Sequence, residues 1–125
     1  MTDKPQILPP TLRERKRYLA FKVISEQKLN YNDLSIAIWH AVLNFMGEFG
    51  TGEADIWIIK DSYKDDEQTG IVKCDHLAVD KVRAALALVQ RIGDTRVVIR
   101  VLGISGTINA TKKKFFGEKD LANYT

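Results

Sequence analysis

The chain has 125 residues, of which 45% are hydrophobic and 28% are charged, a composition typical of a globular protein with a single core. No apolar run approaches the roughly 18 residues that a membrane span requires, and the polar start is unlike a secretory signal. The single cysteine excludes an internal disulfide, which favours a reducing compartment, the cytoplasm.

The net charge of +3 is small, so the distribution of the charges is more informative than their sum. Four cations fall within five residues near the N-terminus, and three more lie in a row near the other end. They are Arg13, Arg15, Lys16 and Arg17, and then Lys112, Lys113 and Lys114. Because the acids gather elsewhere, mainly over residues 61–67, we expect a polarised surface whose basic side contacts phosphates.

The first half of the chain predicts an arm, a strand and a helix. Residues 1–16 form a basic N-terminal arm, because the Pro9-Pro10 pair cannot continue a helix and stiffens an extended chain. Over residues 17–24, Leu19, Phe21 and Val23 alternate with the less apolar Tyr18, Ala20 and Lys22, which is typical of a strand, with the first three of these side chains pointing toward the helices. Asn32 is the expected N-cap of a helix that runs to residue 49 and ends at Gly50 and Gly52.

The second half predicts a hairpin, a helix, a strand and a tail. Strands are expected over residues 54–62 and 69–75, and a charged turn joins them. A 3.6-residue apolar period predicts a helix over residues 79–92, closed by Gly93. A last strand over residues 95–104 precedes a Lys-rich tail, residues 109–125, with a short helix around residues 109–116.

This order of elements predicts an α+β domain over residues 17–108. The sequence β-α-β-β-α-β is the ferredoxin-like split arrangement. We therefore expect a four-stranded antiparallel sheet with two helices on one face. The other face is expected to be open, apart from the N-terminal arm and the C-terminal tail.

Two apolar surfaces of this fold need a cover. Eleven of the sixteen residues from Leu34 to Phe49 are apolar, more than the stripe that packing on one sheet requires. Either the C-terminal tail folds back over this helix, or a protein partner covers it. On the open sheet face, a small apolar patch with a charged rim indicates a protein interface or a partly solvated face. The expected interface residues are Tyr18, Ile36, Trp39, Leu43, Val98 and Leu102.

No group of residues predicts catalysis. His40 lies among apolar neighbours in the first helix, and the Cys74-x-His76 pair has no second pair to complete a zinc site. Asp55, Asp61 and Asp65 could serve a two-metal nuclease, but a mobile turn is a poor rigid site. Stacking of bases on the sheet is not expected, because the third strand has no aromatic residue.

Several motifs together resemble one family. The opening Leu8-Pro9-Pro10-Thr11-Leu12-Arg13, followed by Lys16-Arg17-Tyr18, resembles that of archaeal ribonuclease P protein component 2. The resemblance continues through Phe49-Gly50-Thr51-Gly52, Val79-Asp80-Lys81-Val82-Arg83-Ala84-Ala85-Leu86 and Gly103-Ile104-Ser105-Gly106-Thr107-Ile108, and it covers about residues 8–117.

The resemblance implies a non-catalytic subunit of ribonuclease P, the endonuclease that removes 5′ leaders from precursor tRNA. In that family the RNA subunit performs the chemistry with magnesium, so this chain would bind no cofactor itself. The implied partners are ribonuclease P RNA, protein component 3 and the other ribonuclease P proteins, with precursor tRNA as the substrate of the holoenzyme. Two pairs with component 3 can assemble into a heterotetramer through component 2. Carried to this chain, the seven cations given above are the expected RNA contacts.

Two other hypotheses stay open on the residues alone. One is a ferredoxin-like module that binds a protein or a small ligand and never contacts RNA. The other is a metal-dependent nuclease that uses Asp55, Asp61 and Asp65. Cleavage of precursor tRNA by the purified chain would distinguish the nuclease from the other two.

Overall fold

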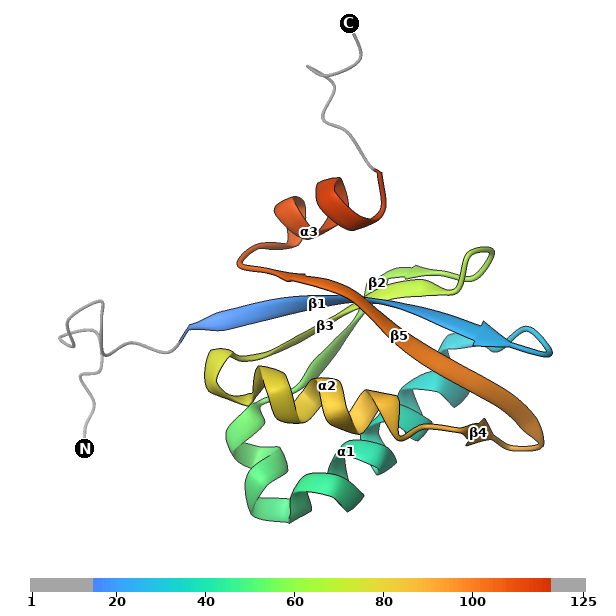
Figure 1. The fold of residues 1–125 in the computed structure, drawn as a ribbon, viewed down its shortest axis with the longest axis horizontal. Helices are drawn as coiled ribbons and strands as arrows, with labels where there is room; N and C mark the ends of the chain where they lie inside the picture. The colour runs from blue at the N-terminus through green and yellow to red at the C-terminus, as the bar shows by residue number, and fades with distance from the viewer. Residues whose placement is uncertain (1–14, 118–125) are drawn as a thin grey trace, which may run out of the picture.

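A computed structural model describes residues 15–117 and shows one antiparallel sheet with helices on both of its faces (Figure 1). The elements, in chain order, are β1 (Lys16–Ser25), α1 (Tyr31–Ala54), β2 (Trp57–Lys64), β3 (Thr69–Asp75), η3 (His76–Ala78), α2 (Val79–Ala87), β4 (Arg91–Ile92), β5 (Thr95–Ser105) and α3 (Ile108–Phe115). The long elements up to β5 follow the predicted order β-α-β-β-α-β. None of the described helices is both long and apolar enough to cross a membrane.

The sheet has five strands in the order β2-β3-β1-β5-β4, so the prediction of four strands is wrong. The additional strand, β4, is two residues long and forms a hairpin with β5. Gly93 has a φ of 63° in the turn of this hairpin, where the twist of the strands favours a positive φ. It is therefore not the end of α2, which stops at Ala87.

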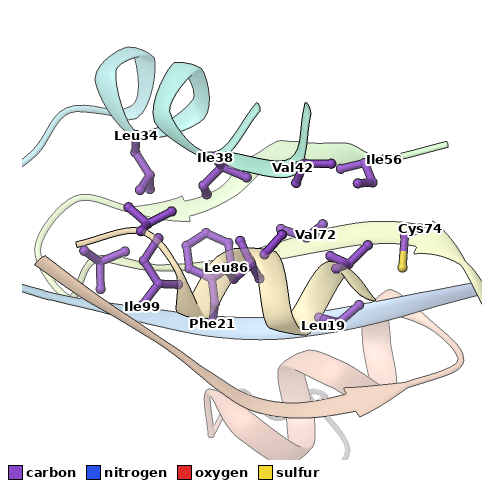
Figure 2. Packing of buried hydrophobic residues seen from close by; sticks show 14 of the residues in the cluster. Leu19, Phe21, Leu34, Ile38, Val42, Ile56, Val72, Cys74, Leu86 and Ile99 are labelled. Carbon is purple, nitrogen blue, oxygen red and sulfur yellow. The ribbon is translucent and has the colours of Figure 1, made fainter. Parts of the chain in front are cut away.

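Helices α1 and α2 cover one face of the sheet, and the hydrophobic core lies between them and the strands (Figures 1 and 2). The alternation that predicted β1 places every second side chain in this core, because neighbouring side chains of a strand point to opposite faces. The largest fully buried side chains include Leu19, Phe21, Leu34, Ile38 and Leu86. The prediction that Leu19, Phe21 and Val23 face the helices is therefore confirmed.

Helix α1 differs from the prediction at both of its ends. Its N-cap is Asn30, whose Oδ1 accepts a hydrogen bond from the Asp33 backbone N–H at 2.8 Å. Gly47 interrupts the helix with φ 75° and ψ 173°, a conformation that is essentially restricted to glycine. Gly50 and Gly52 lie inside the helical segment that follows, so they do not terminate it. That segment ends where Asp55 adopts a left-handed conformation.

Helix α3 lies on the opposite face of the sheet, against β1 and β5 (Figure 1). Its N-cap Thr107 accepts a hydrogen bond from the Ala110 backbone N–H at 3.1 Å. The Phe115 ring lies over Gly103 so closely that a Cβ on Gly103 would be 2.1 Å from two atoms of the ring. The described part of the tail, residues 109–117, therefore folds back onto the face that was predicted to be open and not onto α1.

Candidate nucleic-acid and protein interfaces

The predicted N-terminal basic cluster begins outside the described residues, where Arg13 lies. Arg15 is exposed, and its carbonyl oxygen accepts a hydrogen bond from the His76 backbone N–H at 2.9 Å. Arg17 is half-buried, and its Nη1 donates to the Lys16 carbonyl at 2.9 Å. The backbone of this segment is thus tied to the sheet and to η3, which fixes the point from which the exposed Arg15 side chain extends.

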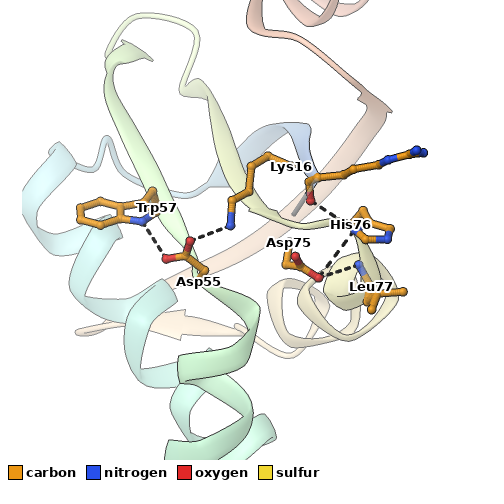
Figure 3. Close-up of polar contacts among 7 residues, drawn as sticks. Lys16, Asp55, Trp57, Asp75, His76 and Leu77 are labelled. Carbon is orange, nitrogen blue, oxygen red and sulfur yellow. Dashed lines mark hydrogen bonds and ion pairs between the residues drawn. The ribbon is translucent and has the colours of Figure 1, made fainter. Parts of the chain in front are cut away.

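Lys16 contacts an acidic partner from a distant part of the chain. Its Nζ lies 2.7 Å from Oδ2 of Asp55, which follows α1, and the other carboxylate oxygen accepts a hydrogen bond from Trp57 Nε1 at 3.0 Å (Figure 3). The hydrogen bonds from Lys16 and Trp57 lower the pKa of Asp55, because they favour its charged form. Lys16 therefore stabilises the junction between α1 and β2, a role that the sequence analysis missed.

The three lysines predicted as RNA contacts lie in the last turn of α3. Lys112 is half-buried, and Lys113 and Lys114 are exposed. Cations at this end of a helix are favourable in any case, because the carbonyl ends of the peptide dipoles are partially negative. The three lysines therefore lie on the face of the sheet opposite to the one that α1 and α2 cover. Arg15 directly precedes β1, so the N-terminal cluster and the three lysines belong to different elements.

Helix α1 keeps an exposed apolar surface, which we call the α1 surface and define as Ile36, Trp39 and Phe45. Their exposed fractions are 55%, 46% and 46%. The predicted interface residue Leu43 is half-buried beside them. Since α3 packs on the other face of the sheet, the described part of the tail does not cover α1, which was one of the two covers considered for this helix.

A groove of about 570 Å³ runs between α1 and the edge strand β2. Two tryptophans, Trp39 from α1 and Trp57 from β2, line it together with Ile36. Trp57 is 60% exposed, yet the Asp55 carboxylate fixes the orientation of its indole. Exposed, oriented tryptophans are typical of residues that dominate binding at protein interfaces. Trp57 was not predicted as a site residue, because the apolar run around it indicates a strand buried on both faces.

The predicted apolar patch on the open sheet face is largely covered. Ala20 and Ile71 are completely buried, and neither belongs to the core under α1 and α2. The predicted interface residues Tyr18 and Leu102 are half-buried, whereas Val98 is 55% exposed. Among the described residues of this face, those at the end beyond α3 therefore stay the most exposed.

The residues considered for catalysis do not form a common site. Burial raises the pKa of Cys74 to about 11, so its thiol is protonated at neutral pH. His40 is exposed, although its neighbours in the sequence are apolar. Asp61 and Asp65 are exposed, while Asp55 is held by Lys16. Within residues 15–117, no three His, Cys, Asp or Glu side chains are grouped so that they could hold a metal ion.

Comparison with known proteins identifies the family. The model of the Rpp14/Pop5 family matches residues 17–116. The chain belongs to the Rpp14/Pop5 family. Its curated relatives include "Ribonuclease P protein component 2" of Pyrococcus furiosus, 47% identical over 118 residues that make up 94% of this chain and 97% of the relative. The protein of the same name from Methanocaldococcus jannaschii is 40% identical and covers 95% of this chain and 86% of its own length.

A solved structure supports the fold of this Rpp14/Pop5 protein. A chain in the cryo-EM structure of yeast Ribonuclease MRP superposes with a TM-score of 0.56, over 74% of this chain and 75% of that chain. The sequence identity of 12% restricts this likeness to the fold. The family match agrees with the resemblance found in the sequence motifs, which extends from residue 8 to residue 117.

Proposed function

We propose that this chain is a non-catalytic protein subunit of ribonuclease P that supports the catalytic RNA in removing 5′ leaders from precursor tRNA. One observation carries the proposal. Relatives named for this role are 40–47% identical and align over nearly the whole of both chains. We further infer that the long elements form a ferredoxin-like split β-α-β-β-α-β domain, extended by β4 and α3, and that the protein acts in the cytoplasm.

Catalysis is assigned to the RNA subunit with its magnesium ions, and none of it to a side chain of this protein. The assignment is supported by a protonated Cys74 and by the engagement of Asp55 with Lys16 and Trp57. Of the residues named in the nuclease hypothesis, only Asp55 has a fixed geometry, and that geometry serves an ion pair. The chain alone is therefore expected to leave precursor tRNA intact at any magnesium concentration.

The α1 surface and the groove beside it are the proposed contacts with companion proteins, component 3 first among them, and with a second copy in a heterotetramer. Two tryptophans on one apolar groove support this assignment. Trp39→Ala is expected to lower the free energy of unfolding by only about 1 kcal/mol, because half of the ring is exposed, yet to weaken capture of component 3. The control is Ile38→Ala, which removes a fully buried side chain and should cost about 2–5 kcal/mol.

For RNA, the proposed contacts are Arg13, Arg15 and Arg17, together with the α3 lysines Lys112, Lys113 and Lys114. Arg is suited to phosphate because its guanidinium donates two parallel hydrogen bonds. Lys16 is proposed to act through Asp55, by holding the start of β1 in place. Arg13→Ala combined with Arg17→Ala should reduce the salt dependence of RNA binding by at most about two counterions. An unchanged salt slope would remove the N-terminal segment from the interface.

Reconstitution tests the proposal directly. Ribonuclease P RNA, component 3 and the other protein subunits are combined with precursor tRNA, with and without this chain. We expect faster leader removal, or removal at lower magnesium, when the chain is present. No effect of the chain on cleavage would contradict the proposal, and robust cleavage by the chain alone would favour the nuclease. Retention of component 3 without any effect on RNA would favour the protein-interaction module.

A further inference from the structure

Two pairs of like charges face each other across strands at one end of the sheet. Arg91 is opposite Arg96 in the β4–β5 hairpin, and Lys22 is opposite Arg100 between β1 and β5. All four residues are exposed, and we call them the distal basic face. Within residues 15–117, none of the four forms an ion pair with an acidic side chain.

The strand alternation places three of these side chains on the face that carries α3. Val97 and Ile99 of β5 are buried in the core, so Arg96 and Arg100 point away from it. Lys22 lies between the buried residues Phe21 and Val23 of β1 and points the same way. Arg91 joins them because it is directly opposite Arg96.

An apolar pair separates the two charged pairs. Ile24 is opposite Val98, and their exposed fractions are 48% and 55%. Arg96 and Arg100 are four residues apart on β5, which corresponds to about 13 Å along the strand. The face therefore presents two rows of positive charge around an aliphatic row, without an aromatic ring between them.

This arrangement is unfavourable for the isolated fold. Like charges directly opposite each other on neighbouring strands are destabilising. The nearest compensation is weak, since the Glu26 carboxylate accepts a long hydrogen bond of 3.4 Å from the Arg96 backbone N–H. Among residues 15–117, the Arg96 guanidinium forms no ion pair with Glu26 or with another acid. Within the β4–β5 hairpin itself the one acid is Asp94, which is exposed in the turn. An anionic ligand would relieve both repulsive pairs at once.

The distal basic face is continuous with the lysines of α3. Phe115 packs on Gly103, and Gly103 is three residues, or about 10 Å, beyond Arg100 on the same strand. Helix α3 thus lies along the same face of β1 and β5 as Lys22, Arg96 and Arg100, and Arg91 extends this face onto β4. Cations follow this face from the β4–β5 hairpin to the last turn of α3.

We propose that the distal basic face binds the phosphate backbone of double-helical RNA. The proposal rests on the proposed function, and it adds an RNA contact that lies at the opposite end of β1 from Arg15. Ile24 and Val98 offer no ring on which a base could stack, so the contact is to the backbone of a duplex and not to an unpaired strand. Arg contributes most of the charge, as is typical of phosphate recognition.

The test removes two charges from this face of the full-length protein. The probe is a fluorescent 20-base-pair RNA duplex, titrated at several KCl concentrations, with the single strand as a comparison. Arg96→Gln with Arg100→Gln should reduce the slope of log affinity against log salt concentration by about two. The matched control, Lys81→Gln with Arg83→Gln, removes the same charge from exposed positions of α2 on the other side of the sheet and should leave the slope unchanged.

Thermal unfolding supplies a second readout that does not depend on RNA. Relief of the repulsion should keep the midpoint of the R96Q/R100Q variant at or above that of the unmodified protein at low salt, with the gain lost at high salt. Arg96→Lys with Arg100→Lys keeps the charge and should keep the salt slope. A folded R96Q/R100Q variant with an unchanged slope overturns the proposal, as does an equal loss in the α2 control.

The remaining outcomes separate this inference from the proposed function. If the unmodified protein accelerates cleavage of precursor tRNA but does not bind the duplex, the distal basic face is not an RNA site and the proposed function stands. If the variant keeps its salt slope but no longer co-elutes with component 3, the face is a contact for an acidic protein surface and the RNA proposal fails.

Discussion

The contact between Gly103 and Phe115 makes the placement of α3 testable by a single methyl group. Gly103→Ala adds a Cβ that would lie 2.1 Å from both Cε1 and Cζ of the Phe115 ring. Ordinary carbon contacts begin at about 3.5 Å, so the ring or the strand must move by about 1.4 Å. Overpacking of this kind typically costs about 1–3 kcal/mol. We expect that loss in the free energy of unfolding.

A double-mutant cycle with Phe115 isolates the contact. Urea denaturation would be followed by tryptophan fluorescence in the unmodified protein, in each single variant and in Gly103→Ala with Phe115→Ala. Once the ring is removed, the added methyl group has space, so we expect the double variant to be more stable than the sum of the single losses predicts, by about 1 kcal/mol or more. Amide exchange in α3, for example at Thr111, should accelerate in Gly103→Ala because the helix is held less tightly.

The control for this cycle is another glycine near the start of α3. A Cβ on Gly106 meets no atom within 4 Å, so Gly106→Ala should change the free energy of unfolding by less than about 0.5 kcal/mol. Equal losses for Gly103→Ala and Gly106→Ala would refute the reasoning. Strictly additive losses for Gly103 and Phe115 would also refute it, because the two residues would then not be in contact.

The other predictions concern a thiol, an ion pair and two glycines. Because burial raises the pKa of Cys74 to about 11, the thiol should react with a disulfide reagent at pH 8 only after unfolding in urea, and rapid labelling of the folded protein would contradict this. The lowered pKa of Asp55 means that its ion pair with Lys16 stabilises the fold above pH ~4 and is lost as the pH falls through the lowered value. Asp55→Asn should therefore cost about 0.5–1 kcal/mol at pH 7, since the half-exposed carboxylate is screened by solvent, and progressively less as the pH falls below ~4, as measured by urea denaturation. Gly47→Ala should cost about 1–3 kcal/mol because φ is 75° there. Gly52→Ala, in a helix with open space around it, should stabilise the fold by about 0.5–1 kcal/mol. A gain in stability at both positions would show that α1 does not bend at Gly47.

Local patterns predicted the elements whose side chains repeat regularly. The expected strand over residues 69–75 coincides with β3, and the alternation from Arg17 to Ile24 identified the core side of β1. The glycines were less informative. Gly50, Gly52 and Gly93 were each expected to end a helix, yet only Gly47 interrupts α1 and Gly93 serves a hairpin turn. Glycine is permitted at positive φ but does not require it, so the surrounding fold decides which glycine is used.

The candidate site also combines features that the sequence reveals with features that only the fold creates. Charge clusters are visible in the sequence, but the ion pair of Lys16 joins residues 39 positions apart and could not be inferred from spacing. The opposed pair Lys22–Arg100 could not be inferred either, because it depends on the register between β1 and β5. The pair Arg91–Arg96 depends on the β4–β5 hairpin, and β4 was not predicted. The predicted RNA contacts themselves, including Arg15 and the α3 lysines, stay predictions.

By itself, the amino-acid sequence determined an α+β chain of alternating and helical apolar periods, a family resemblance carried by ordered motifs, and two clusters of cations. Tertiary structure alone decided which face α3 covers, because that depends on a space above Gly103 into which the Phe115 ring fits. It also decided that the end of the sheet beyond α3 is positively charged and exposed. Periodicity is a property of neighbours along the chain, whereas packing and register join residues that are distant in sequence, and only the folded chain brings those together.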